Sequence, residues 1–171
     1  MAMATARKHG TGDLGFTGLP GGARVPKTHP RIRFFAALDE LGCRLGFARA
    51  LPSSRGASAL LLRFQQALIY AGAQSGDNSA AIKLRAEFRF LEMKTAALET
   101  KLPPLREFLL PGSSAAESAL HSARAACRQA EIMAWPLPGS NLAAAYLNRL
   151  SSCLFALARL SSAAHKPSDQ L

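Results

Sequence analysis

The side chains best suited to chemistry lie on a predicted helix that begins near residue 114. Arg124, Arg128 and Glu131 are spaced four and three residues apart, which places them on one stripe of a helix. Two guanidinium groups on such a stripe suit a triphosphate, because each can donate paired, charge-assisted hydrogen bonds to phosphate oxygens. Glu131 suits the orientation of an arginine or the hydration shell of Mg²⁺. The alternative is a solvated helix face with an ordinary Arg–Glu ion pair.

A second polar segment precedes the helices. Residues 9–19 read HGTGDLGFTGL, and glycine-rich backbone can bring consecutive N–H groups to an anion. Thr11 and Thr17 add hydroxyl donors, and Lys27 adds a positive charge. The segment is not a Walker loop, because the pattern GxxxxGK[ST] is absent. The alternative is a flexible N-terminal arm.

Two further polar positions lie beside apolar helix seams. Asn148 and Ser152 are one helical turn apart, where an amide can bind a phosphate or a metal-bound water; the alternative is a helix–helix hydrogen bond. Asp39 is adjacent to Leu38, so we expect it to need a cationic partner. An arginine of the helix that carries Arg124 is the natural candidate, within one chain or across an interface, and the alternative is an exposed carboxylate.

The scaffold for these residues is predicted to be all-α. Apolar residues recur at spacings of three and four, as in Leu38, Leu41 and Leu45, and this pattern over several helices predicts a left-handed helical bundle. Ser114 to Glu117 reads as a capping box. The predicted helices cover about residues 31–51, 57–75, 79–101, 114–135 and 141–162.

We expect one domain over residues 1–171. It comprises a glycine-rich N-terminal loop (1–30), the helical bundle (31–164) and a frayed tail (165–171). Asn141 is expected to cap the last helix.

Composition excludes several classes of protein. Hydrophobic residues make up 49% and charged residues 19% of the chain, which is typical of a globular protein. No apolar run reaches the length of a membrane span, and the N-terminus lacks the apolar centre of a signal peptide. The net charge of +10 favours an anionic partner. A nucleic-acid partner is not predicted, because basic and aromatic residues do not interleave.

The cysteines and histidines predict neither a disulfide scaffold nor a zinc site. Cys43, Cys127 and Cys153 fall in apolar helical stretches without a CxxC pair, so we expect buried thiols in a reducing cytoplasm. The four histidines have no zinc-like spacing.

Six segments, taken in order, resemble the PduO-type ATP:cob(I)alamin adenosyltransferases. They cover most of the chain, and their shared order and spacing make the resemblance specific. The segments are TGDLGFTGLPGGARVPKTHPRI, LDELGCRLGFARA, FQQALIYAGA, LPPLREFLLPGSS, ALHSARAACRQAE and YLNRLSSCLFALAR.

The resemblance implies a five-helix bundle that forms a homotrimer with active sites between subunits. ATP would lie between the glycine-rich segment of one subunit and the fourth helix of its neighbour, with Arg128 and Glu131 as the catalytic residues. Phe108 would keep the lower face of the corrin free of its axial base, and Asp39 would pair with Arg124 across the interface. The implied ATP-binding residues are His9, Gly10, Thr11, Gly12, Thr17, Gly18, Lys27, Arg128, Gln129, Glu131 and Asn148.

The resemblance also implies the reaction and its partners. Cob(I)alamin would attack the 5′-carbon of ATP, so that triphosphate leaves and adenosylcobalamin forms, with Mg²⁺ helping to hold the phosphates. The cofactor supplies the nucleophile, and the protein aligns the reactants and stabilises the leaving charge. A flavoprotein reductase and an adenosylcobalamin-dependent mutase would be partners in the cytoplasm.

The sequence departs from the family pattern at several polar positions. A basic residue is replaced by Gly10, and arginines by Gln129 and Ile132. Further departures are Leu14, Gly42, Ser113 and Ser152. Losing one charged contact at a triphosphate costs about 1.5–3 kcal/mol. Two hypotheses therefore stay open: an active adenosyltransferase, and a non-catalytic relative that binds corrinoid or nucleotide or serves in assembly or regulation. A third hypothesis, outside the family, is a basic helical bundle that binds nucleic acid.

Overall fold

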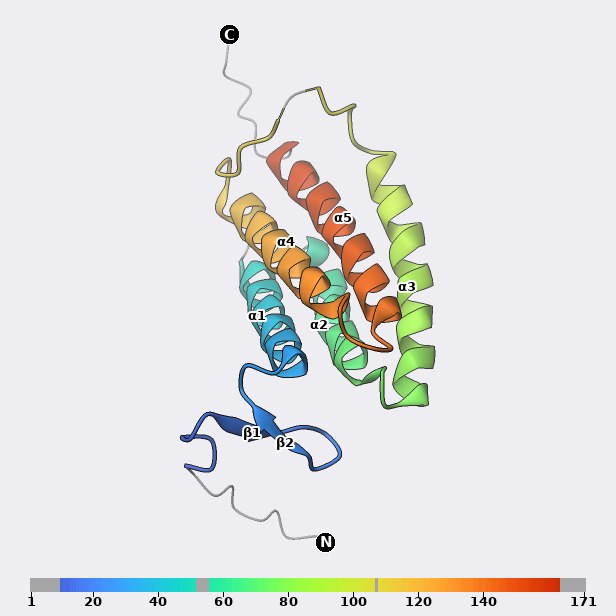
Figure 1. The fold of residues 1–171 in the computed structure, drawn as a ribbon. Coiled ribbons are helices and arrows are strands. Elements are labelled where there is room, and N and C mark those ends of the chain that lie inside the picture. The colour runs from blue at the N-terminus through green and yellow to red at the C-terminus, as the bar shows by residue number, and fades with distance from the viewer. Residues whose placement is uncertain (1–9, 52–55, 107, 164–171) are drawn as a thin grey trace, which may run out of the picture.

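Five helices and one short hairpin make up the computed structural model, which describes residues 10–51, 56–106 and 108–163. Figure 1 shows the helices running side by side, with the hairpin beyond the N-terminal end of the first helix. The hairpin is formed by β1 (Phe16–Gly18) and β2 (Arg24–Pro26). The helices are α1 (Pro30–Ala50), α2 (Ser58–Ala73), α3 (Asn78–Glu99), α4 (Ala115–Ala134) and α5 (Asn141–Ala163). The predicted all-α bundle is confirmed.

Helices α4 and α5 lie side by side, with α1 packed on α4 and α3 packed on α5. Helix α2 packs against α1 and α3 and closes the bundle. The predicted seams are buried in the shared core, so Leu41, Leu61, Leu84 and Leu147 are fully buried. On α4 the seam is mostly alanine, as at Ala123 and Ala130. Small side chains let neighbouring helix backbones approach closely, which explains how α4 fits between α1 and α5.

Polar side chains begin three of the helices. Ser114 caps α4 by accepting a hydrogen bond from the Glu117 amide at 3.2 Å, as the capping box predicts. Asp77 accepts from Ser79 N at the start of α3, and His29 accepts from Arg31 N at the start of α1. Asn141, the predicted cap of α5, is instead the first residue of that helix, and the Ser140 carbonyl accepts its first hydrogen bond.

The N-terminal segment is not loop throughout, contrary to the prediction. The strands β1 and β2 pair antiparallel with Thr17 opposite Val25. Gly21 and Gly22 adopt φ angles of 96° and 90° in the connecting turn, a region that favours glycine. Each strand has only three residues, too few for the alternation of apolar and polar residues that reveals a strand in a sequence.

No helix within the described residues is long and apolar enough to cross a membrane. The predicted frayed tail, residues 165–171, lies outside the described residues, as does His9.

Candidate functional site

The predicted site residues fall on two separate parts of the chain. One part is the hairpin and the turns before it, and the other is the outer stripe of α4 with the neighbouring surface of α5. The strands of the hairpin pack mainly on each other, and Figure 1 shows them beyond the bundle, at the start of α1. A single copy of the chain therefore does not join the two parts into one cleft.

Lys27 lies directly over the glycine-rich turn. A methyl group added at Gly12 would come within 3.2 Å of Lys27 Nζ and 3.3 Å of its Cε. Glycine at this position therefore lets the lysine side chain approach the backbone closely, which places its ammonium group beside Gly12. Arg24 donates to the Thr11 carbonyl at 2.7 Å and fixes the turn to β2. Residues 10–27 therefore form turns and a hairpin, whereas the alternative interpretation of this segment was a flexible N-terminal arm.

Part of the predicted amide cradle is used within the turns. The Asp13 amide donates to the Gly10 carbonyl, and the Gly15 amide donates to the Gly12 carbonyl, each at 3.2 Å. These two amides would have to break those bonds to bind a phosphate. The groups of this segment that remain available to a phosphate are thus mainly the side chains of Lys27, the half-buried Thr17 and the exposed Thr11.

The outer stripe of α4 presents Arg128 to solvent. Arg128 and Gln129 are exposed, and Glu131 is half-buried. The Glu131 carboxylate accepts from Trp135 Nε1 at 3.3 Å. The alternative interpretation, an Arg128–Glu131 ion pair, is not found among the described side chains. Arg128 is exposed because α1 and α5 cover α4 along its alanine seam, and Arg128 lies off that seam.

Asn148 lies on α5, the helix packed beside α4. It is exposed, and its carbonyl accepts from the Ser151 hydroxyl at 2.8 Å. No described hydrogen bond engages its side-chain amide, so the helix–helix hydrogen bond that was the alternative is not found among the described residues. The amide oxygen and the Glu131 carboxylate are oxygen donors of the kind that Mg²⁺ prefers.

The described residues hold no cluster of three acidic, histidine or cysteine side chains that could cage a metal. A Mg²⁺ carried by a nucleotide needs no such cage, because it keeps several waters and binds phosphate oxygens with one or two protein ligands. The oxygen donors of Glu131 and Asn148 therefore fit that ion.

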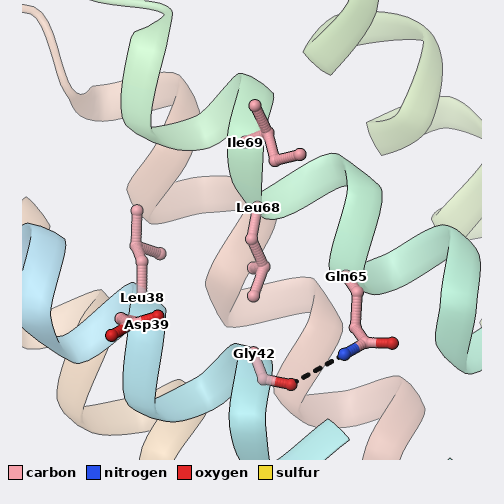
Figure 2. A pocket seen from close by; sticks show the side chains of 6 residues that line it. All are labelled: Leu38, Asp39, Gly42, Gln65, Leu68 and Ile69. Atoms are coloured by element: carbon pink, nitrogen blue, oxygen red, sulfur yellow. Dashed lines mark hydrogen bonds between the residues drawn. The ribbon is translucent and has the colours of Figure 1, made fainter. Parts of the chain in front are cut away.

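Asp39 is exposed on α1 and is not paired within the described chain. Figure 2 shows it beside Leu38 at a hollow of about 260 Å³ between α1 and α2. Gln65 also lines the hollow and donates to the Gly42 carbonyl at 2.9 Å. Arg124 does not reach Asp39 in one copy, because it points instead to His121 and the ring of Phe155.

A buried histidine–glutamate pair lies at the start of α4, and its two residues were not among those predicted to form the site. His121 Nε2 and Glu117 Oε1 are 3.1 Å apart, and the two residues are only 6% and 3% exposed. Arg124 Nε donates to His121 Nδ1 at 3.4 Å. A neutral imidazole with its proton on Nε2 satisfies both contacts. Glu117 and His121 are four residues apart, which puts both side chains on one helix face. This spacing was the sequence signal by which the pair could have been predicted.

Burial lowers the pKa of His121 below its ordinary value of 6.5, and Arg124 adds to this effect while Glu117 opposes it. In the unfolded chain His121 regains its ordinary pKa, so the unfolded state binds more protons as the pH falls below 6.5. The contribution of His121 to stability is therefore complete above pH 6.5 and is lost as the pH falls toward its folded pKa.

Acidification from about pH 7.5 to about pH 5.5 should thus lower the free energy of unfolding of the wild-type protein. The measurement is urea denaturation at each pH, followed by circular dichroism. In His121→Gln, which cannot titrate, the dependence on pH over this range should be weaker. An equal dependence in both proteins would show that other groups cause it.

The cysteines divide into two kinds. Cys127 and Cys153 are buried as predicted, and burial raises the pKa of Cys153 to about 11. Cys127 donates to the Leu147 carbonyl at 3.2 Å. Cys43 is exposed, so its predicted burial is wrong. It lies two residues from both Leu41 and Leu45, which turns it about 200° away from that seam on a helix.

Phe108 lies on the segment between α3 and α4, residues 100–114, which has no helix or strand among its described residues. Its ring is 90% exposed, and Leu110 is 82% exposed. Large apolar side chains exposed in this way have no role in the core of one chain.

The cobalamin adenosyltransferase family model matches residues 8–161. The corrinoid adenosyltransferase PduO of Citrobacter freundii is 37% identical over 161 residues, covering 87% of this chain and 48% of that protein. The corrinoid adenosyltransferase of Mycobacterium leprae is 37% identical over 169 residues, covering 89% of this chain and 88% of that protein. The chain thus spans about half the length of the Citrobacter relative and most of the mycobacterial one.

Solved structures give the same likeness. A phenylalanine-to-histidine variant of a PduO-type ATP:corrinoid adenosyltransferase from Lactobacillus reuteri, complexed with cobalamin and ATP, superposes with a TM-score of 0.82 at 27% identity. The match covers 92% of this chain and 91% of that one. An arginine-to-lysine variant from the same organism, complexed with ATP, has a TM-score of 0.81 at 29% identity.

Proposed function

The chain belongs to the cobalamin adenosyltransferase family, and on that premise we propose that it transfers the 5′-deoxyadenosyl group of ATP to cob(I)alamin. The observation that carries the proposal is the exposed Arg128 on α4, which forms no ion pair within the described chain. The oxygen donors Glu131 and Asn148 lie on the same helix and on the neighbouring helix α5. An unpaired guanidinium group at such a position is available to a polyphosphate.

The proposed reaction is a displacement at the 5′-carbon of ATP. The electron pair of Co(I) forms the cobalt–carbon bond, and the carbon–oxygen bond breaks with its electron pair passing to triphosphate. Cobalt is formally oxidised to Co(III). Because the corrinoid supplies the nucleophile, the task of the protein is to align the reactants and stabilise the charge on the leaving group.

We assign the positive groups to the triphosphate. Arg128 would donate to phosphate oxygens with Gln129 beside it, and Lys27 would contribute a charge from the hairpin. His9, Gly10, Thr11, Gly12, Thr17 and Gly18 would line the nucleotide with their backbone and hydroxyl groups. Glu131 and Asn148 would hold a Mg²⁺ that neutralises phosphate charge.

We propose that one complete site needs two copies of the chain. The separation of the hairpin from the Arg128 stripe within one copy supports this view. A homotrimer with cyclic symmetry would place the hairpin of each copy against α4 of the next. Asp39 would then pair with Arg124 across the interface, and such pairing would remove Arg124 from its present contact with His121.

The exposed Phe108 is assigned to the corrinoid. An apolar ring against the lower face of the corrin would exclude water and the axial base, which favours Co(I). Because Co(I) must be generated by reduction, a flavoprotein reductase is the proposed supplier. An adenosylcobalamin-dependent mutase is the proposed acceptor of the product, and the proposed location is the cytoplasm.

A non-catalytic binding role is the second candidate. Gln129 is exposed at the site and carries no charge, and Ile132 is an exposed apolar side chain on the same helix. With fewer positive charges, the protein would stabilise the leaving triphosphate less, while corrinoid binding would be unaffected.

The test of the proposed function is an anaerobic assay with chemically reduced cob(I)alamin, ATP and Mg²⁺. Light-sensitive adenosylcobalamin should form only when the protein is present, as followed by corrinoid absorbance, and one triphosphate should appear for each adenosylcobalamin. Corrinoid binding without any turnover would favour the non-catalytic role.

A further inference from the structure

The Phe108 segment is held at its two ends. Near its start, the Arg159 guanidinium of α5 donates to the Pro103 carbonyl. Near its end, the amides of Gly112 and Ser113 donate to Glu117 Oε2 at 2.9 and 3.2 Å. No described hydrogen bond engages residues 104–106 or 108–111. The described hydrogen bonds that hold the segment to the bundle therefore lie at its two ends, where the Ser113 hydroxyl also donates to the Ser162 hydroxyl of α5 at 3.1 Å.

Glu117 makes more contacts than helix capping requires. In a capping box the glutamate side chain returns to the amide of the cap residue, here Ser114. Glu117 reaches further back instead, to the two residues before the cap, and its second oxygen contacts His121. A buried carboxylate is stable only when its oxygens are satisfied, and these contacts, with the Ser118 hydroxyl that donates at 3.4 Å, supply four polar partners. Hydrogen bonds from amides to a carboxylate are also stronger than neutral ones.

Both anchors are connected through one aromatic ring of α5. The rings of His121 and Phe155 form an edge-to-face pair at a centroid distance of 5.9 Å. The guanidinium of Arg159 lies 5.9 Å from the same ring. The anchor at Glu117 is thus braced by His121 and Phe155, and the anchor at Pro103 rests on the same side chain. Both ends of the segment are thus attached to one cluster of side chains on α4 and α5.

We infer that Glu117 is a positioning residue, which fixes the Gly112–Ser113 end of the segment so that Phe108 stands at the corrinoid, with His121 holding the carboxylate in place. This inference rests on the proposed function. It assigns Glu117 no contact with either substrate. Its effect should pass entirely through Phe108 and leave nucleotide binding unchanged.

A double-mutant cycle tests this inference through the kinetics of the corrinoid. Glu117→Ala should lower kcat/KM for cob(I)alamin by about ten- to a hundredfold, because small misplacements of a positioned group have effects of that size. The KM for ATP should change by less than about twofold. In the Phe108→Ala background, Glu117→Ala should cause no further loss, since its only route of action is already removed. The amides of Gly112 and Ser113 should also exchange hydrogen faster in the single variant.

Matched variants separate positioning from loss of charge or stability. Glu92→Ala removes one carboxylate from the exposed face of α3 and should leave the corrinoid kinetics unchanged. Glu117→Gln keeps one oxygen that can accept from the two amides, so it should recover part of the activity, and it replaces Glu117→Ala in the cycle if that variant does not fold.

Two outcomes would overturn the inference alone. One is that the losses from Glu117→Ala and Phe108→Ala multiply in the double variant, and the other is that the KM for ATP rises with that for corrinoid. An inactive wild-type protein is a different result, because it would overturn the proposed function and this inference together.

Discussion

Arg128→Ala should lower kcat/KM for ATP by about a hundredfold, because removing one preorganised donor from a developing anion typically costs about a hundred- to a thousandfold. Arg128 is exposed and contributes no side chain to the core, so the melting temperature should be unchanged. Arg128→Lys keeps the charge but loses the paired donors, and should be intermediate. The measurement is the initial rate of adenosylcobalamin formation across a series of ATP concentrations.

The matched control is Arg89→Ala. Arg89 is an exposed arginine on α3, which does not adjoin α4. This substitution changes the net charge equally and should have no effect on the rate. If Arg128→Ala and Arg89→Ala behaved alike, the assignment of Arg128 to the triphosphate would be wrong.

Phe108→Ala should reduce the rate with cob(I)alamin while leaving the KM for ATP near its wild-type value. Burying a phenylalanine against an apolar surface contributes about 1.5–3 kcal/mol, which corresponds to about a ten- to a hundredfold change in rate. Because the ring is 90% exposed in one copy of the chain, its removal should not lower the free energy of unfolding. Rates at varied corrinoid and at varied ATP, with a thermal melt of each protein, provide the measurement.

Leu110→Ala serves as the comparison for Phe108→Ala. Leu110 is an equally prominent apolar side chain, 82% exposed and two residues along the same segment. Its truncation should cost much less activity, since the proposed contact is with the ring at residue 108. Equal losses in both variants would indicate a general requirement for an apolar segment instead of a specific role for Phe108.

The helices were predictable because their apolar residues repeat over many turns. Leu38, Leu41 and Leu45 define the buried face of α1, and the same seam correctly implies that residues off it are exposed. Applying that logic to Cys43 would have avoided the wrong prediction of a buried thiol, because the residue type suggested burial while its position did not. The capping signal of Ser114 was equally direct.

The hairpin and the Glu117 anchor were not predictable in the same way. Three-residue strands leave no periodic pattern, and the turn glycines Gly21 and Gly22 indicate a bend without indicating that a strand lies on either side of it. The reach of Glu117 to Gly112 depends on how the preceding segment folds back. The spacing of Glu117 and His121 suggests that they pair but does not indicate that Glu117 also contacts Gly112.

The candidate site itself lies between these cases. The stripe of Arg124, Arg128 and Glu131 follows from helical spacing, but their environments differ, since Arg124 contacts His121 and Phe155 whereas Arg128 faces solvent. In the proposed assembly, the residues that complete the site come from a second copy of the chain. The proposed pairing of Asp39 with Arg124 belongs to that group.

The most direct test of a site shared between copies is to co-express two inactive variants. Lys27→Ala removes the proposed phosphate contact of the hairpin, and Arg128→Ala removes the proposed phosphate contact of α4. In a trimer that contains both variants, about one interface in three joins an intact hairpin to an intact α4, so purified mixed oligomers should regain about a third of the wild-type rate of adenosylcobalamin formation. If mixed oligomers, verified by a separate affinity tag on each variant, stay as inactive as their parents, the proposal that one active site is built from two copies is contradicted.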